Sequence, residues 1–560
     1  MTWTLAEQAN PMPSKLRVCL INPRFRPSIW TRDNVLSQLP GDKRSWIVTG
    51  SLPALAALAP EHCDVVLVDE NVEDIDFEQL GDFDIVGVTG MIVQRDRMFE
   101  ILDRLRDLPV TAVVGGPYVS VAESEFVDRC DVRFIGEAEE TWPRFLTAFA
   151  QDGVVQRRYE QDAKTNMETV PTPRYDLLKP GRYMVASLQF SRGCPFMCEF
   201  CDIITIFGRR PRLKLPAQMV LEFEAIVKAG FSTCFLVDDN FIGNKAKAKE
   251  LLRVLIDWQR ANNYPLIFST EASINLGDDE EMLDLMRMAN FRQVFVGIES
   301  PRASSLAETR KVQNVRGDSM LEKLQRIRDK GLVIHAGFIV GFDADDEAIF
   351  DEQFEFIQQS GIALVSVAVL CPIPTTPLCD RLKTEGRLDL SDPHVSFHPK
   401  NMTREVLKAG YDRLVRRLYQ PDAYFDRLVN GYVGSPGFRR SRASQAALAG
   451  RKHSSLSRLA ELAGAALMAA RLARTIIAKR EEMSLGSAYV RHWRRNRRLC
   501  GQEAISFASF VFLCADHWHF YTVSQNSTRF QIGSSRPETL RPLPANEDLY
   551  LRIADGRKAS

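Results

Sequence analysis

The chain of 560 residues lacks the sequence features of secreted and membrane-spanning proteins. Its first residues, MTWTLAEQANPMPSKLRVCL, contain no basic segment followed by an apolar one, so we expect no secretory signal. No run of about 18 or more apolar residues occurs, so no membrane-spanning helix is expected. The 11 cysteines are too sparse for the disulfide framework of a small secreted domain. We therefore expect a cytoplasmic protein.

The chain also lacks a net charge, with 72 Lys and Arg residues against 72 Asp and Glu residues. This balance gives no electrostatic reason to expect a nucleic-acid partner. Histidine is scarce, and none of the 8 histidines occurs between His62 and His335. The length itself predicts roughly three or four domains.

Short Val- and Ile-rich runs alternate with helix-like segments in the first part of the chain. The runs begin at Leu16, Asp64, Asp84 and Thr111, and they are short enough to be buried strands. Strands that alternate with helices predict a parallel sheet, so we expect a doubly wound, Rossmann-like domain at 1–150. Such sheets bind ligands at the carboxyl ends of their strands. No G-x-G-x-x-G motif follows the first strand, which disfavours a dinucleotide site.

The rest of the chain divides into four parts by its pattern. Residues 151–180 are polar and rich in proline, as is typical of a linker. Residues 181–394 alternate strands and helices again, which predicts a partial (β/α) barrel of about six units. Residues 395–525 predict a mainly helical domain with basic faces, and 526–560 a loosely ordered tail. The predicted fold class is therefore α/β, with a helical C-terminal domain.

Three cysteines, Cys194, Cys198 and Cys201, follow the first barrel strand in the sequence FSRGCPFMCEFCD. Thiolates are soft ligands that suit iron–sulfur clusters. A C-x3-C-x2-C loop can hold three corners of a cubane cluster and leave one iron open to a substrate or cofactor, as catalytic zinc keeps an open position. A zinc site would need a fourth ligand, for which Asp202 is the neighbouring candidate. Structural cysteines are the other alternative.

The motif SRGCPFMCEFCD, together with VDDNF, GIES, AGFIVGFD and PIPTTPL, resembles the radical S-adenosylmethionine (SAM) superfamily. The resemblance implies a [4Fe–4S] cluster on the three cysteines, with SAM on the open iron and no further catalytic side chain. Arg310 or Lys311 could reach the SAM carboxylate. Helix capping is the alternative role of the three polar residues in VDDNF, and close packing is that of the second glycine in AGFIVGFD. The implied SAM-contacting residues are Phe200, Asp238, Asp239, Asn240, Glu271, Glu299 and Gly341.

The first domain, with NPRF at its first turn and GGPY and GEAE near its end, resembles the cobalamin-binding class of radical SAM enzymes. The D-x-H-x-x-G cobalamin motif is absent from the first turn, so no histidine of that motif can ligate the cobalt. A vestigial structural domain is the alternative. The segments AYVRHWRRN and DHWHFYTVSQ resemble the trailing domain of the branch that includes hopanoid C-2 methylases. The residues implied to bind cobalamin are Asn22, Gly90, Gly115, Gly116 and Pro117.

The resemblance implies methylation of an unactivated carbon through a 5′-deoxyadenosyl radical and methylcobalamin. The implied substrate is a small apolar molecule or natural product, for which a hopanoid is one candidate. The implied electron donor is flavodoxin- or ferredoxin-like. The basic helices near the C-terminus could contact a membrane surface or could be solvated faces. Two alternatives remain open: a cobalamin-dependent enzyme that cyclises, oxidises or joins carbon atoms, and a non-enzymatic iron–sulfur redox or sensor protein.

Overall fold

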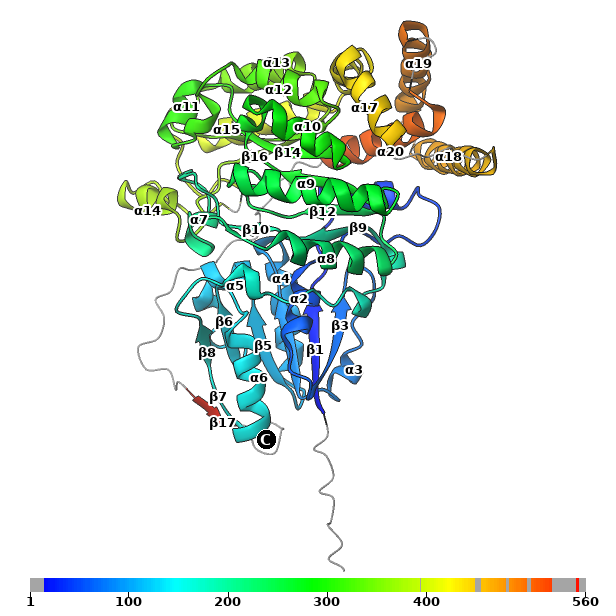
Figure 1. The fold of residues 1–560 in the computed structure, drawn as a ribbon. Helices are drawn as coiled ribbons and strands as arrows, with labels where there is room; N and C mark the ends of the chain where they lie inside the picture. Colours follow the sequence, from blue (N-terminus) through cyan, green and yellow to red (C-terminus); the bar gives the residue numbers. More distant parts are fainter. Residues whose placement is uncertain are drawn as a thin grey trace, which may run out of the picture.

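The protein is built around two parallel sheets, one above the other, with a helical region beside the upper one (Figure 1). We describe it from a computed structural model. Apart from 550–552, the predicted tail at 526–560 lies outside the described residues. The structure describes residues 15–392, 394–448, 455–479, 483–500, 505–525 and 550–552.

The first sheet has six parallel strands in the order β3-β1-β4-β5-β6-β8. Because the order reverses beside β1, this is the doubly wound arrangement that the sequence predicts. The strands are β1 (Leu16–Asn22), β3 (Cys63–Asp69), β4 (Ile85–Thr89), β5 (Thr111–Gly115), β6 (Val132–Ile135) and β8 (Arg158–Glu160).

Helices cover both faces of this sheet because successive side chains of a strand point to opposite faces. Val18 and Leu20 pack in one hydrophobic cluster with α2 (Ser51–Leu58) and α6 (Thr141–Asp152). Cys19 and Ile21 pack in a second cluster on the other face. The helices of that cluster are α3 (Phe77–Leu80), α4 (Arg95–Leu105) and α5 (Pro117–Val121).

The second sheet is the predicted partial barrel, and six of its strands follow one another in chain order. Each pair of neighbours is parallel. The strands are β9 (Tyr183–Leu188), β12 (Thr233–Leu236), β13 (Ile267–Glu271), β14 (Phe291–Glu299), β15 (Val333–Val340) and β16 (Leu364–Val369). The helices between and after them are α7 (Ile203–Ile206), α8 (Pro216–Lys228), α9 (Lys245–Ala261), α10 (Glu280–Met288), α11 (Ala303–Glu308), α12 (Met320–Asp329), α13 (Ile349–Ser360) and α14 (Pro377–Thr384).

Two segments cross between the predicted domains. Strand β2 (Ser45–Ile47) comes from the predicted first domain, yet it pairs with β9 at the edge of the barrel sheet. Strand β8 comes from the predicted linker, yet it pairs with β6 of the first sheet. The predicted domain boundaries remain a prediction, but the two sheets are joined by more than a linker.

The region after the barrel is helical, as the sequence predicts. Its last helix is buried on nearly every side and contacts the chain segment after β1, where Asp516 pairs with Arg32 at 3.1 Å. No helix among the described residues is both long enough and apolar enough to cross a membrane. The helices are α15 (Arg404–Leu418), α16 (Pro421–Leu428), α17 (Pro436–Leu448), α18 (Ser455–Ala478), α19 (Met483–Cys500) and α20 (Phe507–Ser524).

The other short elements are paired ribbons and one short helix. Strand β10 (Ser191–Arg192) pairs with β11 (Arg212–Leu213), and β7 (Val154–Gln156) pairs with β17 (Tyr550–Arg552). Helix α1 (Asp33–Leu36) packs against α20.

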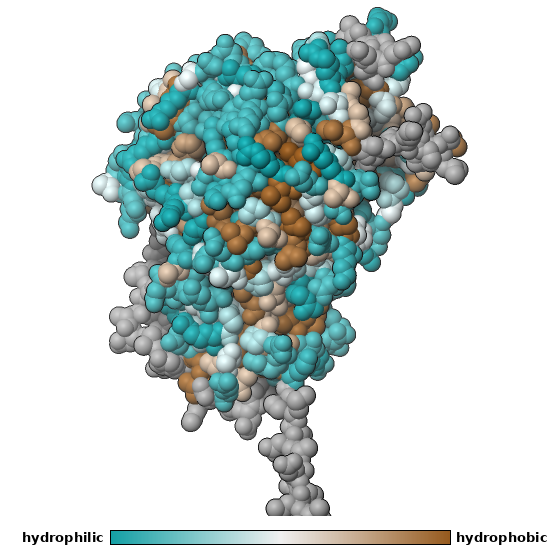
Figure 2. Space-filling view, viewed as in Figure 1, coloured by the Kyte–Doolittle hydropathy of each residue, from teal (hydrophilic) through white to brown (hydrophobic). Residues whose placement is uncertain are grey.

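Figure 2 shows that the face viewed is mostly hydrophilic, with a narrow apolar band down its middle.

Candidate active site

The three cysteines lie in one irregular loop between β10 and α7, beyond the carboxyl end of β9. This is the end of a parallel barrel at which active sites are built. Cys198 is buried, and Cys194 and Cys201 are half-buried. The amide of Cys201 donates to the carbonyl of Cys198 at 3.2 Å, and that of Cys194 donates to Gly208 at 3.3 Å. The loop therefore folds back on itself and brings the thiols together.

The thiols lie close enough to influence one another's protonation. The pKa of Cys201 is raised to about 12, mainly by burial, with smaller contributions from the charges of Asp202 and Cys198. The pKa of Cys194 is raised for the same leading reason. A metal binds the thiolate and displaces the proton, so a trio of this kind suits a soft metal centre.

This trio differs from a site for a single metal ion. Within the described ranges, no three His, Cys, Asp or Glu side chains are grouped as they would be around one ion. A cubane cluster binds each cysteine at a different iron, so its ligands need not converge on one point. The donor set therefore fits the cluster that the sequence predicts.

A buried ion pair stands beside the cysteines. The ammonium nitrogen of Lys311 lies 2.5 Å from Oε1 of Glu299 and 5.8 Å from the centre of the Phe200 ring. Burial by itself would lower the pKa of Lys311, but the charges of Glu299 and Cys198 raise it above its usual value. Of the two basic residues that the sequence offers, Lys311 is buried at the site and Arg310 is exposed.

The backbone of β14 is distorted so that Glu299 can reach this position. Glu299 has a φ of +64°, which non-glycine residues rarely adopt, and the pairing of β14 with β15 shifts register beside it. A Cβ on Gly297 would lie 2.4 Å from Oε1 of Glu299, so only glycine leaves room for the pair. Such local strain is typical of functional sites.

The three polar residues after β12 hold the cysteine loop. Asp238 accepts hydrogen bonds from the amide of Phe190 and the hydroxyl of Ser191, both at 2.8 Å. Asp239 accepts from the amide of Gly193 at 2.6 Å. Burial raises the pKa of Asp238 to about 7 and that of Asp239 to about 6.

Asn240 completes this set. Its amide nitrogen lies 3.1 Å from the hydroxyl of Ser273 and 4.0 Å from the sulfur of Cys194. The capping of the following helix, α9, falls instead to Asn244, which accepts from the amide of Lys247. The three residues therefore brace the loop that carries the thiols, and contact with SAM remains a prediction for each.

Glu271 differs from these carboxylates because its side chain has no partner among the residues that the structure describes. It ends β13 and is half-buried, and the described residues form no hydrogen bond or ion pair with its side chain. Burial raises the pKa of this carboxyl to about 7, and the charges of Asp239 and Asp238 contribute. A half-buried carboxylate with a raised pKa at the carboxyl end of a barrel strand is a candidate for ligand binding.

The other two predicted SAM contacts have structural roles as well. Phe200 is half-buried, and its ring centre lies 6.0 Å from that of Phe342. Gly341 has a φ of +103°, and a Cβ there would lie 3.0 Å from a methyl carbon of Leu407. Close packing thus accounts for this glycine without SAM.

Gln313 joins the site without any signal in the sequence. It is buried, and its amide nitrogen lies 3.7 Å from the sulfur of Cys198. Its side-chain oxygen has no hydrogen-bond partner. Only the fold brings this residue to the cysteines, because the segment after α11 turns back toward the cysteine loop, where Glu199 donates its amide to Thr309.

The five residues predicted to bind cobalamin lie along the carboxyl edge of the first sheet. Asn22 is buried and donates to Asp69 and Thr49, and it accepts from Gln94, each at 2.9 Å. Its polar atoms are thus used within the protein, and the network ties the ends of the strands together.

The glycines at this edge pack closely against neighbouring residues. A Cβ on Gly116, whose φ is +100°, would lie 2.5 Å from the hydroxyl of Thr89, and one on Gly90 would lie 2.7 Å from the sulfur of Met98. Gly115 packs against Phe134, and Pro117 begins α5 at an exposed position. These contacts give the glycines a packing role, and cobalamin binding remains a prediction for all five residues.

Ion pairs join this edge to the cysteine loop. Arg192, two residues before the first cysteine, lies 2.9 Å from Oε1 of Glu137 and 2.6 Å from Oε1 of Glu139. Arg212 on β11 contacts the same oxygen of Glu137 at 2.9 Å. Both carboxylates belong to the sequence GEAE after β6. The first sheet and the cysteine loop are therefore fixed to each other by buried charges.

An aromatic group lines the barrel at the level of Glu271. Phe295 on β14 and His335 on β15 are in register with Glu271. Trp30, from the loop after β1, lies with its ring centre 4.9 Å from that of His335 and 5.6 Å from that of Phe295. Burial lowers the pKa of His335 to about 3, so the imidazole is neutral. Trp30 is 38% exposed and Phe295 is half-buried, whereas His335 is buried.

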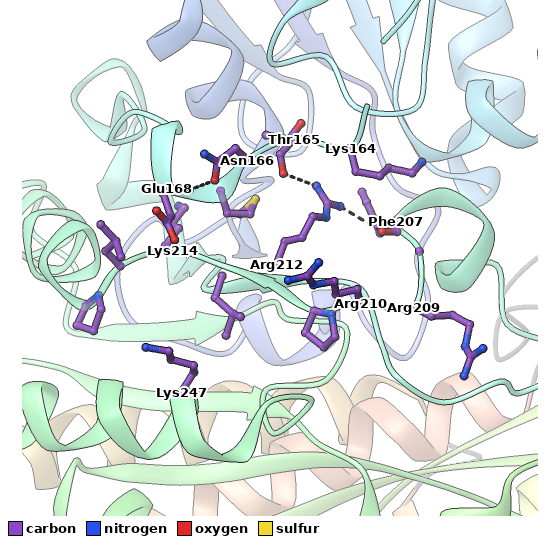
Figure 3. A pocket seen from close by; sticks show the side chains of 16 residues that line it. Lys164, Thr165, Asn166, Glu168, Phe207, Arg209, Arg210, Arg212, Lys214 and Lys247 are labelled. Carbon is purple, nitrogen blue, oxygen red and sulfur yellow. Dashed lines mark hydrogen bonds between the residues drawn. The ribbon is translucent and has the colours of Figure 1, made fainter. Parts of the chain in front are cut away.

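A basic cavity of about 580 Å³ is lined by residues 164–168, by the segment 207–216 that follows α7, and by Lys247 (Figure 3). Arg212 and Lys214 are neutralised by Glu137 and Glu222. Arg209 and Arg210 are exposed, and neither pairs with a carboxylate of the described chain. The cations that line the cavity are Lys164, Arg209, Arg210, Arg212, Lys214 and Lys247.

Comparison with known proteins places this site in a family. Residues 188–357 match the radical SAM superfamily, and residues 376–531 match a domain of unknown function (DUF4070). An uncharacterized methyltransferase of Synechocystis sp. is 38% identical over 421 residues, which cover 74% of this chain and 78% of that protein. The hopanoid C-2 methylase of Rhodopseudomonas palustris is 32% identical over 415 residues, or 73% and 78% of the two chains.

The chain belongs to the radical SAM superfamily, in the family of the hopanoid C-2 methylase. It is therefore a radical SAM enzyme of a methyltransferase family, and the predicted enzyme class is confirmed. The alternative of a non-enzymatic iron–sulfur redox or sensor protein is wrong.

Solved structures share the fold of this radical SAM enzyme. The cobalamin-dependent SAM radical enzyme OxsB, with aqua-cobalamin and SAM bound, matches with a TM-score of 0.58 and 15% identity over 84% of this chain and 81% of that chain. The radical SAM methyltransferase TsrM from Kitasatospora setae, with tryptophan and a SAM analogue bound, matches with a TM-score of 0.53 and 17% identity over 67% and 77%. At these identities the likeness confirms the α/β fold class and nothing beyond it.

The buried ion pairs at Glu137 yield a prediction about the cluster. Glu137→Gln leaves Arg192 and Arg212 with less negative charge, and breaking a buried pair typically costs about 3–5 kcal/mol. We expect this variant to hold less iron and sulfide per chain after anaerobic reconstitution, and to melt at a lower temperature. Iron and sulfide analysis and circular dichroism measure the two effects.

The matched control is Glu140→Gln, because Glu140 is an exposed carboxylate three residues away on the same turn. It should keep the iron content and melting temperature of the parent. Full iron content in Glu137→Gln would show that the ion pairs do not hold the cysteine loop.

Proposed function

We propose that this radical SAM enzyme methylates an unactivated carbon of an apolar polycyclic lipid, such as a hopanoid, with the aid of cobalamin. The observation that carries the proposal is the trio of free thiols at the carboxyl end of the barrel. Buried ion pairs join the loop region of these thiols to the carboxyl edge of the first sheet. The identity with the hopanoid C-2 methylase over three quarters of each chain supports the substrate class.

The chain's own residues would hold and orient the cofactors. Cys194, Cys198 and Cys201 would bind three irons, and the unpaired carboxylate of Glu271 would accept hydrogen bonds from the SAM ammonium. The glycine-rich edge after β5 would receive cobalamin. When bound, the cluster and SAM supply a radical that removes hydrogen from an unactivated carbon, and cobalamin supplies the methyl group.

The central test is the product of the anaerobically reconstituted enzyme with SAM, cobalamin, a reductant and a polycyclic lipid. We expect mass spectrometry to show the gain of one methyl group. Each methylated product should be accompanied by one S-adenosylhomocysteine and one 5′-deoxyadenosine, because one SAM renews the methyl donor and another yields the radical. Replacing all three cysteines by alanine should abolish the cluster's absorbance and both products.

A cobalamin-dependent enzyme that cyclises, oxidises or joins carbon atoms is the competing function. It would form 5′-deoxyadenosine with no S-adenosylhomocysteine, and the lipid would not gain a methyl group. That result with the same substrates would contradict the proposed methyl transfer.

The aromatic group of Trp30, Phe295 and His335 would contact the apolar substrate. A neutral imidazole and two aromatic rings at the level of Glu271 suit a molecule without charge. We expect Trp30→Ala to raise the KM for the lipid about tenfold, and Trp30→Phe to keep most of the affinity, since stacking and burial each contribute on the order of 1 kcal/mol.

The readout that separates binding from folding is the cleavage of SAM in the absence of lipid. It should be unchanged in Trp30→Ala if the tryptophan serves the substrate alone. An unchanged KM for the lipid would show that Trp30 only packs against the barrel.

The basic surface around this cavity would dock a small acidic electron-donor protein of the flavodoxin or ferredoxin type, which is too large to enter the cavity itself. Its unpaired Arg209 and Arg210 follow shortly after the third cysteine, and charge complementarity speeds the association of proteins. We place this exchange in the cytoplasm, where thiols such as these stay reduced.

Reversing the charge of this cavity should slow electron delivery but not the chemistry. We expect Arg209→Glu combined with Arg210→Glu to cleave SAM on the order of tenfold more slowly with reduced flavodoxin. With dithionite, which needs no docking surface, the rate should equal that of the parent. Arg260→Glu, an exposed change at the far end of α9, is the control. Equal rates of SAM cleavage with flavodoxin in all three proteins would show that the donor does not dock at this cavity.

A further inference from the structure

Helix α18 has two apolar faces, of which only one is covered by the protein. The covered face contacts α20 and α19. It consists of Ala465, Met468, Leu472 and Ile476, each at most 6% exposed. The opposite face is solvated, although a helix of a soluble domain normally presents polar residues there.

The solvated side of the helix carries an apolar stripe, although Glu461 and Arg474 are exposed on the same helix. Leu459, Leu462 and Ile477 are 63%, 51% and 66% exposed, and Leu467 is 45% exposed. The alanines between them are exposed too and continue the same stripe at helical spacing: Ala466, Ala470 and Ala473. Met483, at the start of α19, is 59% exposed as well.

Helix α19 adds positive charge at the same corner of the molecule (Figure 1). Residues 483–500 contain no Asp or Glu, whereas several arginines are exposed. Arg491 and Arg495 pair with carboxylates of α16. Arg494 and Arg498 form no ion pair within the described chain. In a protein without net charge, this is a local excess of positive charge.

We propose that the exposed face of α18 and the arginines of α19 bind an anionic membrane surface, with α18 lying in the plane of the interface. An interfacial helix buries its apolar face at the boundary of the acyl chains, and nearby Arg side chains contact anionic headgroups. A second copy of this chain could cover the apolar face, but it would bring like-charged arginines together. An anionic membrane would contact the apolar stripe with its acyl chains and the arginines with its headgroups.

The surface goes beyond the proposed function and does not depend on it. If the substrate is a lipid, docking at this corner would place the enzyme where the lipid resides. The binding test uses no substrate and no cofactor turnover, so its failure is separate from a failure of methyl transfer.

The test is co-sedimentation of the full chain with vesicles. We expect binding to vesicles of equal parts phosphatidylglycerol and phosphatidylcholine that is at least tenfold stronger than binding to phosphatidylcholine alone. High salt should weaken it because the arginine charges are screened. Arg494→Gln combined with Arg498→Gln should weaken binding about tenfold.

The apolar face is tested by Leu459→Glu combined with Ile477→Glu, which should abolish binding. The matched control is Leu221→Glu, since Leu221 on α8 is 58% exposed and lies elsewhere on the molecule. Circular dichroism checks that each variant is folded. Equal binding by parent and double-glutamate variant, or no binding by the parent, overturns the proposal. So does a parent that elutes as a dimer, without vesicle binding, and becomes a monomer in the glutamate variant.

Discussion

The site depends on the buried ion pairs between the cysteine loop and the first sheet. The loop that carries Cys194, Cys198 and Cys201 has almost no regular structure of its own, so its shape is imposed from outside. Arg192 pairs with Glu137 and Glu139. Further contacts to the loop come from the residues after β12 and from the segment after α11.

Buried charges of this kind are expensive unless they are paired, because the interior cannot solvate them. Here the pairing partners come from different parts of the chain, so the charges bind the loop and the first sheet to each other. Removing the first sheet would therefore leave charged residues of the barrel without partners. The same ion pairs keep the carboxyl edge of the first sheet close to the cysteine loop.

The charged groups at the carboxyl end of the barrel have two kinds of role: some hold the cysteine loop in place, and one is available to a ligand. Asp238 and Asp239 use their oxygens on amides and a hydroxyl of the cysteine loop. Lys311 and Glu299 neutralise each other beside the thiols. In contrast to these three carboxylates, the side chain of Glu271 forms no hydrogen bond or ion pair with the described residues, and burial raises its pKa to about 7. A group left unpaired where its neighbours are satisfied indicates a position kept for a ligand.

Much of the architecture could be predicted because it follows from local patterns. Buried parallel strands such as Ile85–Thr89 are short Val- and Ile-rich runs, and their alternation with helices indicates both sheets. The positions of Trp30 and β2 could not be predicted in this way, since each pairs with the barrel across more than a hundred residues. Gln313 likewise carries no local signal, because a glutamine beside a thiol becomes meaningful only when the chain folds back.

The sequence by itself determined the chemistry, because the spacing of three cysteines in a loop limits which metal centre they can hold. It also determined the order of strands and helices, since hydrophobic periodicity is a local property. Only the tertiary structure decided which charges meet, which carboxylate stays free, and which helix face is left without cover. Those outcomes depend on contacts between residues far apart in the chain, and no local pattern encodes such contacts.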